Sequence, residues 1–208
     1  MAAERIPELI LASASPARLE TLTSAGLSPR VVVSAVDEDG FSAPTVIDLV
    51  ARLARAKAEA VAASLAPAGG ELLVVGCDSL LELDGEPLGK PASAAEAALR
   101  WRQMRGRTGH LHTGHEVIRL GEVAGTASGV ATTSVTFADL SDAEIDAYVA
   151  TGEPLRVAGA FTIDGLGGAY VRSVDGDPHT VVGISLPLLR DLFARLGVPW
   201  HALWTPTP

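Results

Sequence analysis

The 208-residue sequence is short of the residues on which several classes of protein depend. It has one cysteine, Cys77, so it forms neither an intrachain disulfide nor a cysteine-based zinc cluster. Aromatic residues make up only 4%, too few for the stacking platforms of single-strand nucleic-acid binders. The net charge of −9 argues against the basic face of a duplex binder, and no apolar run approaches the roughly 18 residues of a membrane span. We therefore expect a cytoplasmic protein that binds neither nucleic acid nor membrane.

Hydrophobic residues, mostly Ala, Val and Leu, make up 48% of the chain. A chain of this length and composition buries a substantial core and fits one large domain or two lobes around one cleft. We see no internal repeat, low-complexity segment or linker. We therefore expect a single domain over residues 1–208.

The most informative stretch is VVGCDSLLELDGEPLGKP, residues 74–91. An apolar strand is predicted at Leu72–Cys77, and Asp78 follows it directly. A hairpin turn is expected at Asp84-Gly85, and Lys90 comes shortly after it. A strand that delivers a carboxylate at its end is a common way to place a polar site on a rigid edge. The alternative is an ordinary hairpin with a charged turn.

A second polar stretch begins after a short strand predicted at 9–12. Ser15 is a good helix N-cap, and proline at the next position costs the helix no hydrogen bond. A helix N-terminus with Ser13 and Arg18 beside it offers unpaired N–H groups, a hydroxyl and a cation to a phosphate. The alternative is a capped helix with a surface arginine.

Lys57 interrupts the apolar stripe of a helix that starts near Thr45. At about 100° per residue, it falls within about 40° of Val46, Val50 and Leu53. A lysine there either extends out of the core or faces a polar cavity, and we favour the cavity because no other charge breaks the pattern. The acidic run at 37–39 follows a strand predicted at 31–33. It either ligates a hard divalent cation through oxygen or forms a solvated loop.

His110, His112 and His115 lie within six residues, which raises the hypothesis of a zinc site. His115 falls on the opposite strand face from the other two, so exposed imidazoles at a strand end are the favoured interpretation. The remaining predicted strands lie at 117–120, 130–137, 170–174 and 180–182. The remaining predicted helices run from 93 to near 106, from 141 through 148, and from 187 to 196.

Several motifs together resemble the Maf family of nucleoside triphosphate pyrophosphatases. The resemblance covers roughly residues 9–198, with family-like order and spacing. The matching segments are LILASASPAR (9–18), VDE (36–38), RLARAKA (52–58), GCDSLLELDGEPLGKP (76–91), GRT and TG (106–108 and 113–114), the segment from GEP to the glycine at 165, and VVGISL (181–186).

The resemblance implies a Maf/ITPase-like mixed α/β (α+β) fold, with two lobes around a deep cleft and a long mixed sheet, often as a homodimer. It implies hydrolysis of a nucleoside triphosphate to the monophosphate and pyrophosphate with a divalent metal, Mg or Mn, as in the removal of non-standard nucleotides. Asp78 matches the catalytic proton acceptor. The other matches are the phosphate-contacting Ser13, Arg18, Lys57 and Lys90, the metal-side Glu38 together with Asp78, and Ser79 and Asp164 in the base or specificity region.

The chain departs from the family pattern at several of these positions. Ala17 replaces the first of two arginines, Val157 replaces a lysine, and Asp164 replaces a glutamine. These losses leave open a second hypothesis, a nucleotide-binding regulator of cell division with little catalysis. A third, a cysteine hydrolase using Cys77, is disfavoured because Cys77 and Asp78 point to opposite faces of a regular strand.

Overall fold

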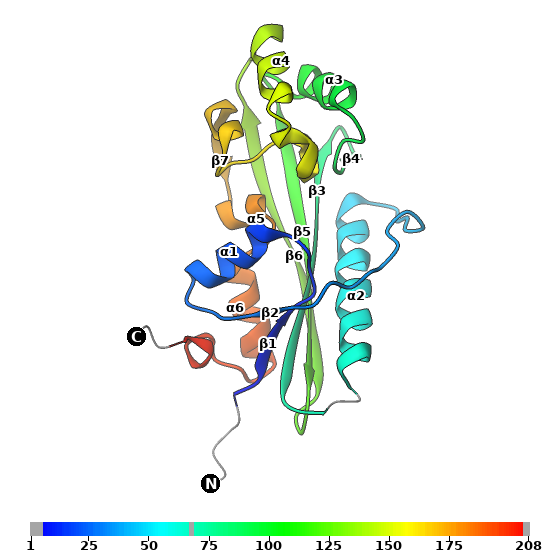
Figure 1. Cartoon of the computed structure of the whole chain (residues 1–208), viewed down its shortest axis with the longest axis vertical. Helices are drawn as coiled ribbons and strands as arrows, with labels where there is room; N and C mark the ends of the chain where they lie inside the picture. Colours follow the sequence, from blue (N-terminus) through cyan, green and yellow to red (C-terminus); the bar gives the residue numbers. More distant parts are fainter. Residues whose placement is uncertain (1–5, 67–68, 206–208) are drawn as a thin grey trace.

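The computed structural model describes residues 6–66 and 69–205, and within them a mixed sheet has the strand order β2-β1-β3-β5-β6-β7, with β4 paired to β3 (Figure 1). The strands are β1 (Glu8–Leu11), β2 (Arg30–Val31), β3 (Leu72–Leu83), β4 (Glu86–Leu88), β5 (Thr108–Leu120), β6 (Gly125–Phe137) and β7 (Val171–Asp175). The α-helices are α1 (Pro16–Ser24), α2 (Val46–Leu65), α3 (Ala94–Met104), α4 (Asp142–Ala150), α5 (Pro178–Val182) and α6 (Leu186–Arg195). Short 3₁₀ helices are η2 (Glu153–Arg156), η3 (Ala158–Ala160), η4 (Leu166–Tyr170) and η5 (Trp200–Leu203). None of the helices in these residues combines the length and apolar character needed to cross a bilayer.

Three long antiparallel strands, β3, β5 and β6, form a spine that links two lobes (Figure 1). In one lobe, β1 adds to β3 in parallel, α2 covers one face of the sheet, and α1 and α6 lie on the other side. In the other lobe, α3 and α4 build a core around Trp101, whose Nε1 donates to Ala160 O at 2.8 Å. The predicted mixed α/β fold with two lobes and a long mixed sheet is confirmed.

Two glycines let α2 lie directly on the spine. A Cβ on Gly76 of β3 would collide with the backbone oxygen of Ala54, and one on Gly114 of β5 would collide with that of Val50. The absence of side chains here therefore sets how closely the helix approaches the sheet. The approach brings Lys57 of α2 over Asp78, two residues along β3 from Gly76.

The predicted N-cap at Ser15 is confirmed, and two other helices begin at side-chain caps of the same kind. Ser15 accepts from Arg18 N, Thr45 accepts from Asp48 N, and Ser141 forms a complete capping box with Glu144. At α3 the cap is a variant, because the Glu96 carboxylate accepts from Ala92 N rather than from the N-cap residue.

Two strand predictions are wrong in ways that matter for the site. The strand that begins at Leu72 does not end at Cys77 but continues to Leu83, so Asp78 lies within β3 and not at its end. Residues 180–182 form the end of helix α5 and not a strand. Asp177 caps that helix by accepting from His179 N, and Pro178 occupies its first turn. The strands predicted at 117–120 and 130–137 are the final parts of the longer β5 and β6.

Candidate active site

The site is organised around a stretch of β3 that has a free edge. β1 pairs with β3 only from Leu72 to Val75, and β4 pairs with it only from Leu81 to Leu83. Between them, in the described part of the chain, residues 76–80 have no strand partner on that side. Side chains from both faces of the sheet can therefore meet a ligand at this gap.

On the α2 side of the sheet, Lys57 bridges two carboxylates. Its Nζ lies 2.5 Å from Asp78 Oδ1 and 2.7 Å from Glu38 Oε1. The Lys57 and Asp78 side chains are about 10% exposed, whereas that of Glu38, which comes from the loop after β2, is 52% exposed. Lys57 therefore does not extend into solvent but is buried between two carboxylates, and the polar cavity favoured from the sequence stays a prediction.

Burial raises the pKa of Asp78 above the usual value for an aspartate, and the charges of Lys57 and Arg18 oppose that shift. A carboxylate with a raised pKa is a better proton acceptor once it is ionised. Lys57 also fixes the position of this carboxylate through its hydrogen bond. Asp78 is therefore a buried carboxylate that is held in place by Lys57 at the free edge of β3.

On the opposite side, Arg18 of α1 donates hydrogen bonds to four uncharged acceptors, which join α1 to β3 and to the residue that follows α5. Its Nη1 donates to Ser13 Oγ and to Cys77 O, each at 3.0 Å, its Nη2 donates to Ser79 Oγ at 3.0 Å, and its Nε donates to Gly183 O at 2.7 Å. The structure thus brings Ser13, Arg18 and Ser79 together, whereas the sequence analysis placed only Ser13 and Arg18 side by side and assigned Ser79 to the base or specificity region. Arg18 is buried without a carboxylate partner among the described residues, so its positive charge is not neutralised nearby.

Thr113 is a member of this cluster to which the sequence analysis assigned no role. Its hydroxyl donates to Thr180 O at 3.0 Å and lies 2.9 Å from Ser79 Oγ. Because the Thr113 proton is committed to Thr180, Ser79 donates to Thr113 while it accepts from Arg18. The TG motif contained Thr113, but its role depends on α5, which the sequence analysis took for a strand.

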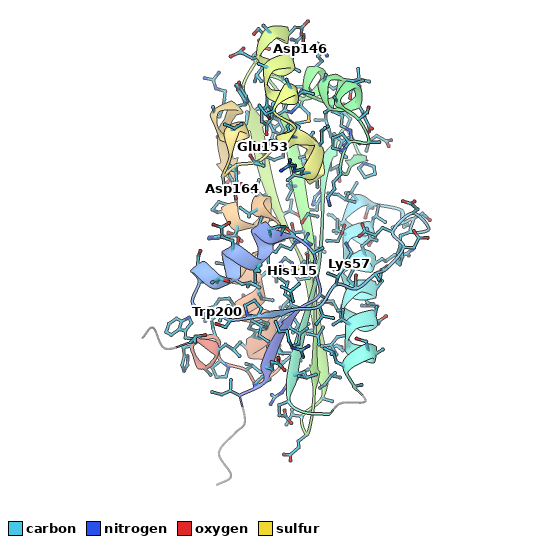
Figure 2. The ribbon with its side chains drawn as sticks, viewed as in Figure 1. Lys57, His115, Asp146, Glu153, Asp164 and Trp200 are labelled. Carbon is cyan, nitrogen blue, oxygen red and sulfur yellow. The ribbon has the colours of Figure 1, made fainter. Side chains whose placement is uncertain are left out.

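Two predicted site residues lie outside these clusters. Lys90 is exposed just beyond β4, and no ion pair in the described residues engages it. Asp164 is exposed between η3 and η4 and lines a pocket with Ala17. Figure 2 shows Asp164 and Lys57 on either side of the spine in this view.

The donors available for a metal are two carboxylates. Asp78 and Glu38 lie within reach of the same ammonium, and their hard oxygen atoms suit Mg²⁺ or Mn²⁺. Within residues 6–66 and 69–205 there is no group of three or more His, Cys, Asp or Glu side chains that could hold an ion. This donor set fits a magnesium-like ion, which commonly takes one or two carboxylates and completes its shell with water and substrate phosphates.

The expectation of exposed imidazoles at a strand end is wrong for two of the three histidines, because His112 and His115 are buried within β5. His112 bonds to Thr132 Oγ1 at 2.8 Å and to Glu82 Oε2 at 3.1 Å, while His115 accepts from Ser185 N at 2.9 Å. Burial and the nearby charge of Arg18 lower the pKa of His115 to about 4, so its imidazole is neutral. His115 therefore anchors the start of α6, and the zinc hypothesis gains no support.

Comparison with known proteins places this chain in a family. The family model described as "Maf-like protein" matches residues 8–196. Proteins named nucleoside triphosphate pyrophosphatase are 55% identical in Salinispora tropica (96% of this chain, 91% of that protein), 53% in Saccharopolyspora erythraea (95% and 97%) and 51% in Mycobacterium ulcerans (96% and 98%). Among solved structures, the Staphylococcus aureus Ham1 protein covers 95% of this chain and 93% of its own, at 17% identity and a TM-score of 0.43. The chain belongs to the Maf-like protein family.

Proposed function

We propose that this protein is a nucleoside triphosphate pyrophosphatase, which hydrolyses its substrate to the monophosphate and pyrophosphate. The observation that carries the proposal is the buried Lys57 that holds Asp78 and Glu38 at the free edge of β3. The names of relatives more than 50% identical over most of the chain support it. The expectations of a single domain and a cytoplasmic location rest on the length and composition of the sequence, and that of a homodimer rests on the resemblance; all three stay predictions.

The phosphates are proposed to bind at the gap beside β3. Arg18 supplies a buried positive charge there that no carboxylate cancels, and the Ser13 hydroxyl lies beside it. Lys57 adds a second cation from the other face, and Lys90 is the exposed cation nearest to β4 along the chain. Convergent cations stabilise the charge that develops on the phosphate oxygens during transfer.

Asp78 is proposed to accept a proton from the attacking water. The water oxygen forms a bond to phosphorus, its proton moves to the Asp78 carboxylate, and the P–O bond of the α–β bridge breaks, which releases pyrophosphate. Asp78 and Glu38 are the side chains proposed to hold Mg²⁺ or Mn²⁺. The ion, when bound, would supply additional charge neutralisation at the phosphates.

A pyrophosphate-release assay with magnesium or manganese tests the proposal, with Asp78→Asn as the critical variant. Loss of a general base is expected to lower kcat by about 10²–10⁴-fold with the fold intact. Asp146→Asn is the matched control, because Asp146 is exposed on α4 and pairs only with Arg102. Undiminished release by Asp78→Asn would refute the assignment of the base. Tight nucleotide binding without release by the wild-type protein would favour the regulator hypothesis instead.

A further inference from the structure

Arg18 keeps one N–H group without a partner in the described structure. A guanidinium carries five N–H groups. Within residues 6–66 and 69–205, four of them donate to oxygen atoms, those of Gly183, Ser13, Cys77 and Ser79. The remaining N–H is on Nη2, whose other N–H donates to Ser79 Oγ at 3.0 Å. Ser79 therefore holds the nitrogen from which Arg18 can still donate to a ligand.

The Ser79 hydroxyl accepts from Arg18 because its own proton is used elsewhere. Ser79 on β3 and Thr113 on β5 are direct cross-strand partners, and their hydroxyl oxygens lie 2.9 Å apart. Thr113 donates its only hydroxyl proton to Thr180 O at 3.0 Å, so the proton between the two hydroxyls belongs to Ser79. The hydrogen bonds therefore run in one direction, from the guanidinium through the two hydroxyls to a carbonyl oxygen of α5.

Thr113 is itself held at its side chain and at its backbone. It is fully buried, and its carbonyl oxygen lies 3.0 Å from His115 Nδ1. Because His115 Nε2 accepts from Ser185 N, the proton of the neutral ring is on Nδ1 and is donated to Thr113 O. Segment 180–185 thus holds Thr113 through its hydroxyl and through His115, and the same segment supplies the Gly183 carbonyl to Arg18.

We propose that Thr113 and Ser79 are positioning residues, which serve the phosphates of the substrate by orienting Arg18 and do not contact the base. The inference rests on the proposed function. Ser79 donates its proton to Thr113, so only its lone pairs remain, and these cannot form a hydrogen bond with a phosphate oxygen. Its contribution to binding therefore passes through Arg18. This assignment differs from the base or specificity role that the resemblance implied for Ser79.

Thr113→Val keeps the shape of the side chain and removes its hydroxyl. Ser79 then lacks the acceptor that fixes its hydroxyl, so its lone pair no longer points steadily at Arg18 Nη2. We expect the binding of a triphosphate to weaken about fivefold, the size of one net hydrogen bond. Thr113→Ser keeps the hydroxyl and should bind within about twofold of wild type.

Thr133→Val is the matched control. Thr133 of β6 is as buried as Thr113, and its hydroxyl donates at 2.9 Å to the carbonyl oxygen of Asp177, which caps α5. The control therefore removes the same group from a threonine that also joins the sheet to α5. The Thr133 hydroxyl makes no hydrogen bond to Ser79 or Arg18 in the part of the chain that the structure describes. We expect a similar loss of stability in urea and an unchanged affinity for a triphosphate.

Two ligands that cannot be hydrolysed separate phosphate binding from base binding. α,β-Methylene ATP has both parts, whereas bis(methylene)triphosphonate has the three phosphorus groups and no base. Their dissociation constants are measured by calorimetry with magnesium for the wild-type protein and each variant. We expect Thr113→Val and Ser79→Ala to weaken both ligands by the same factor. Thr113→Val added to Ser79→Ala should change the affinity by less than about twofold, because both substitutions break one chain of hydrogen bonds.

Several results would overturn the inference. These are wild-type affinity in Thr113→Val, no recovery in Thr113→Ser, additive effects of Thr113→Val and Ser79→Ala, or an equal loss of affinity in Thr133→Val. A loss in Ser79→Ala that affects α,β-methylene ATP alone would assign Ser79 to the base and overturn it as well, as would a wild-type protein that binds neither ligand. Circular dichroism checks each fold, and Ser79→Ala with the two ligands carries the test if Thr113→Val does not fold.

Pyrophosphate release from nucleoside triphosphates, measured on the same proteins, keeps the inference apart from the proposed function. Release by the wild-type protein together with any overturning result would leave the proposed function standing. Coupled losses of affinity for both ligands, without release from any nucleoside triphosphate, would support the positioning role of Thr113 and Ser79 and refute the catalytic function.

Discussion

Arg18 and Lys57 are buried to nearly the same extent, 9% and 8% exposed, and reach the same stretch of β3 from opposite faces. Their partners differ in charge. Lys57 contacts two carboxylates, Asp78 and Glu38, whereas Arg18 donates to two hydroxyl oxygens and two carbonyl oxygens. The charge of Lys57 is therefore compensated where it lies, and that of Arg18 is not.

The uncompensated charge of Arg18 acts on its surroundings. It lowers the pKa of Asp78 and Cys77 against the opposing effect of burial, and it adds to burial in lowering the pKa of His115. A fixed cation of this kind is ready to meet a triphosphate without rearrangement. Lys57 has to exchange at least one carboxylate for a phosphate before it can contribute in the same way. The comparison predicts that Arg18 supports both structure and binding, whereas Lys57 mainly sets the chemistry of Asp78.

Of the substitutions at the two cations, Lys57→Met is expected to have the largest effect on activity, because it leaves the buried Asp78 without a contacting cation. We expect kcat/KM to fall about 10²–10³-fold at neutral pH. The pKa of Asp78, already raised by burial, rises further when Lys57 no longer opposes the shift. Because the base works only when ionised, the rate should increase with pH through this pKa, and that limb should move to higher pH in the variant.

A pH–rate profile measures the shift, and Lys57→Arg, which restores the charge, should return the limb toward the wild-type position. If Lys57→Met lowers the rate equally at every pH, then Lys57 does not control the ionisation of Asp78. The roles of Lys57 and Arg18 would then be more alike than the difference between their hydrogen-bond partners indicates.

Arg18→Ala is expected to have the largest effect on stability. It removes the donor that joins α1 to Ser79 and to the carbonyls of Cys77 and Gly183, and it leaves buried acceptors without a partner. We expect a loss of about 3 kcal/mol in the free energy of unfolding, measured by urea denaturation. Arg18→Lys should recover little, because one ammonium cannot reproduce the fork of donors. An unchanged urea midpoint would contradict a structural role for Arg18.

The contrast between these two cations was only partly predictable from sequence. The apolar stripe of α2 identified Lys57 as a residue that faces a polar site, because helical periodicity depends on local sequence alone. The Ser-Pro cap of α1 was also predicted correctly for the same reason. The partners of both residues come from distant segments, so no local pattern could reveal that Lys57 meets Glu38 or that Arg18 meets Gly183.

The sequence analysis failed where local signals competed. Asp78 was expected at a strand end, but β3 continues past it because the following Leu80, Leu81 and Leu83 extend the strand to the other lobe. What ends near Asp78 is the pairing with β1, a feature of the neighbouring strand. For residues 180–182, β-branched residues favoured a strand, yet the Asp177-Pro178 start specifies a helix. The seven ordered segments still identified the family, since agreement among many weak signals is specific.

Glu153 is the negatively charged counterpart of Arg18, because only uncharged donors form hydrogen bonds with its carboxylate. It therefore provides a further test of how a charge with uncharged partners affects stability, with a smaller expected effect. These hydrogen bonds lower its pKa to about 2 from 4.5, against the opposing effect of burial. The folded-state pKa is depressed, so the stabilisation is fully present above pH 4.5 and is lost as the pH falls toward 2. Glu153→Gln should therefore cost about 1 kcal/mol at pH 7, a modest value because solvent reaches the carboxylate.

Urea denaturation of wild-type and Glu153→Gln protein at several pH values measures this difference. The two proteins should converge in stability toward pH 2. Glu122→Gln gives a matched control, because Glu122 is an exposed acid in the turn between β5 and β6 and its side chain makes no hydrogen bond within the described structure. A difference between wild type and Glu153→Gln that is constant with pH would show that the charge of Glu153 is not what stabilises the segment around Asp164.

The smallest effect is expected for Cys77→Ala, because Cys77 lies next to Asp78 on β3 but contributes its side chain to neither cation. The thiol is fully buried in the core that α6 covers, and burial raises its pKa to about 12. Arg18 bonds to the backbone carbonyl of Cys77, which the substitution retains. We expect activity within twofold of wild type and a stability loss of about 1 kcal/mol from the small cavity.

Ser79→Ala, which removes a side-chain acceptor of Arg18, is the variant to compare with Cys77→Ala. It should raise KM more than Cys77→Ala does. If Cys77→Ala abolished pyrophosphate release while Ser79→Ala did not, the thiol would take part in the chemistry, and the separation of the two faces of β3 would be wrong.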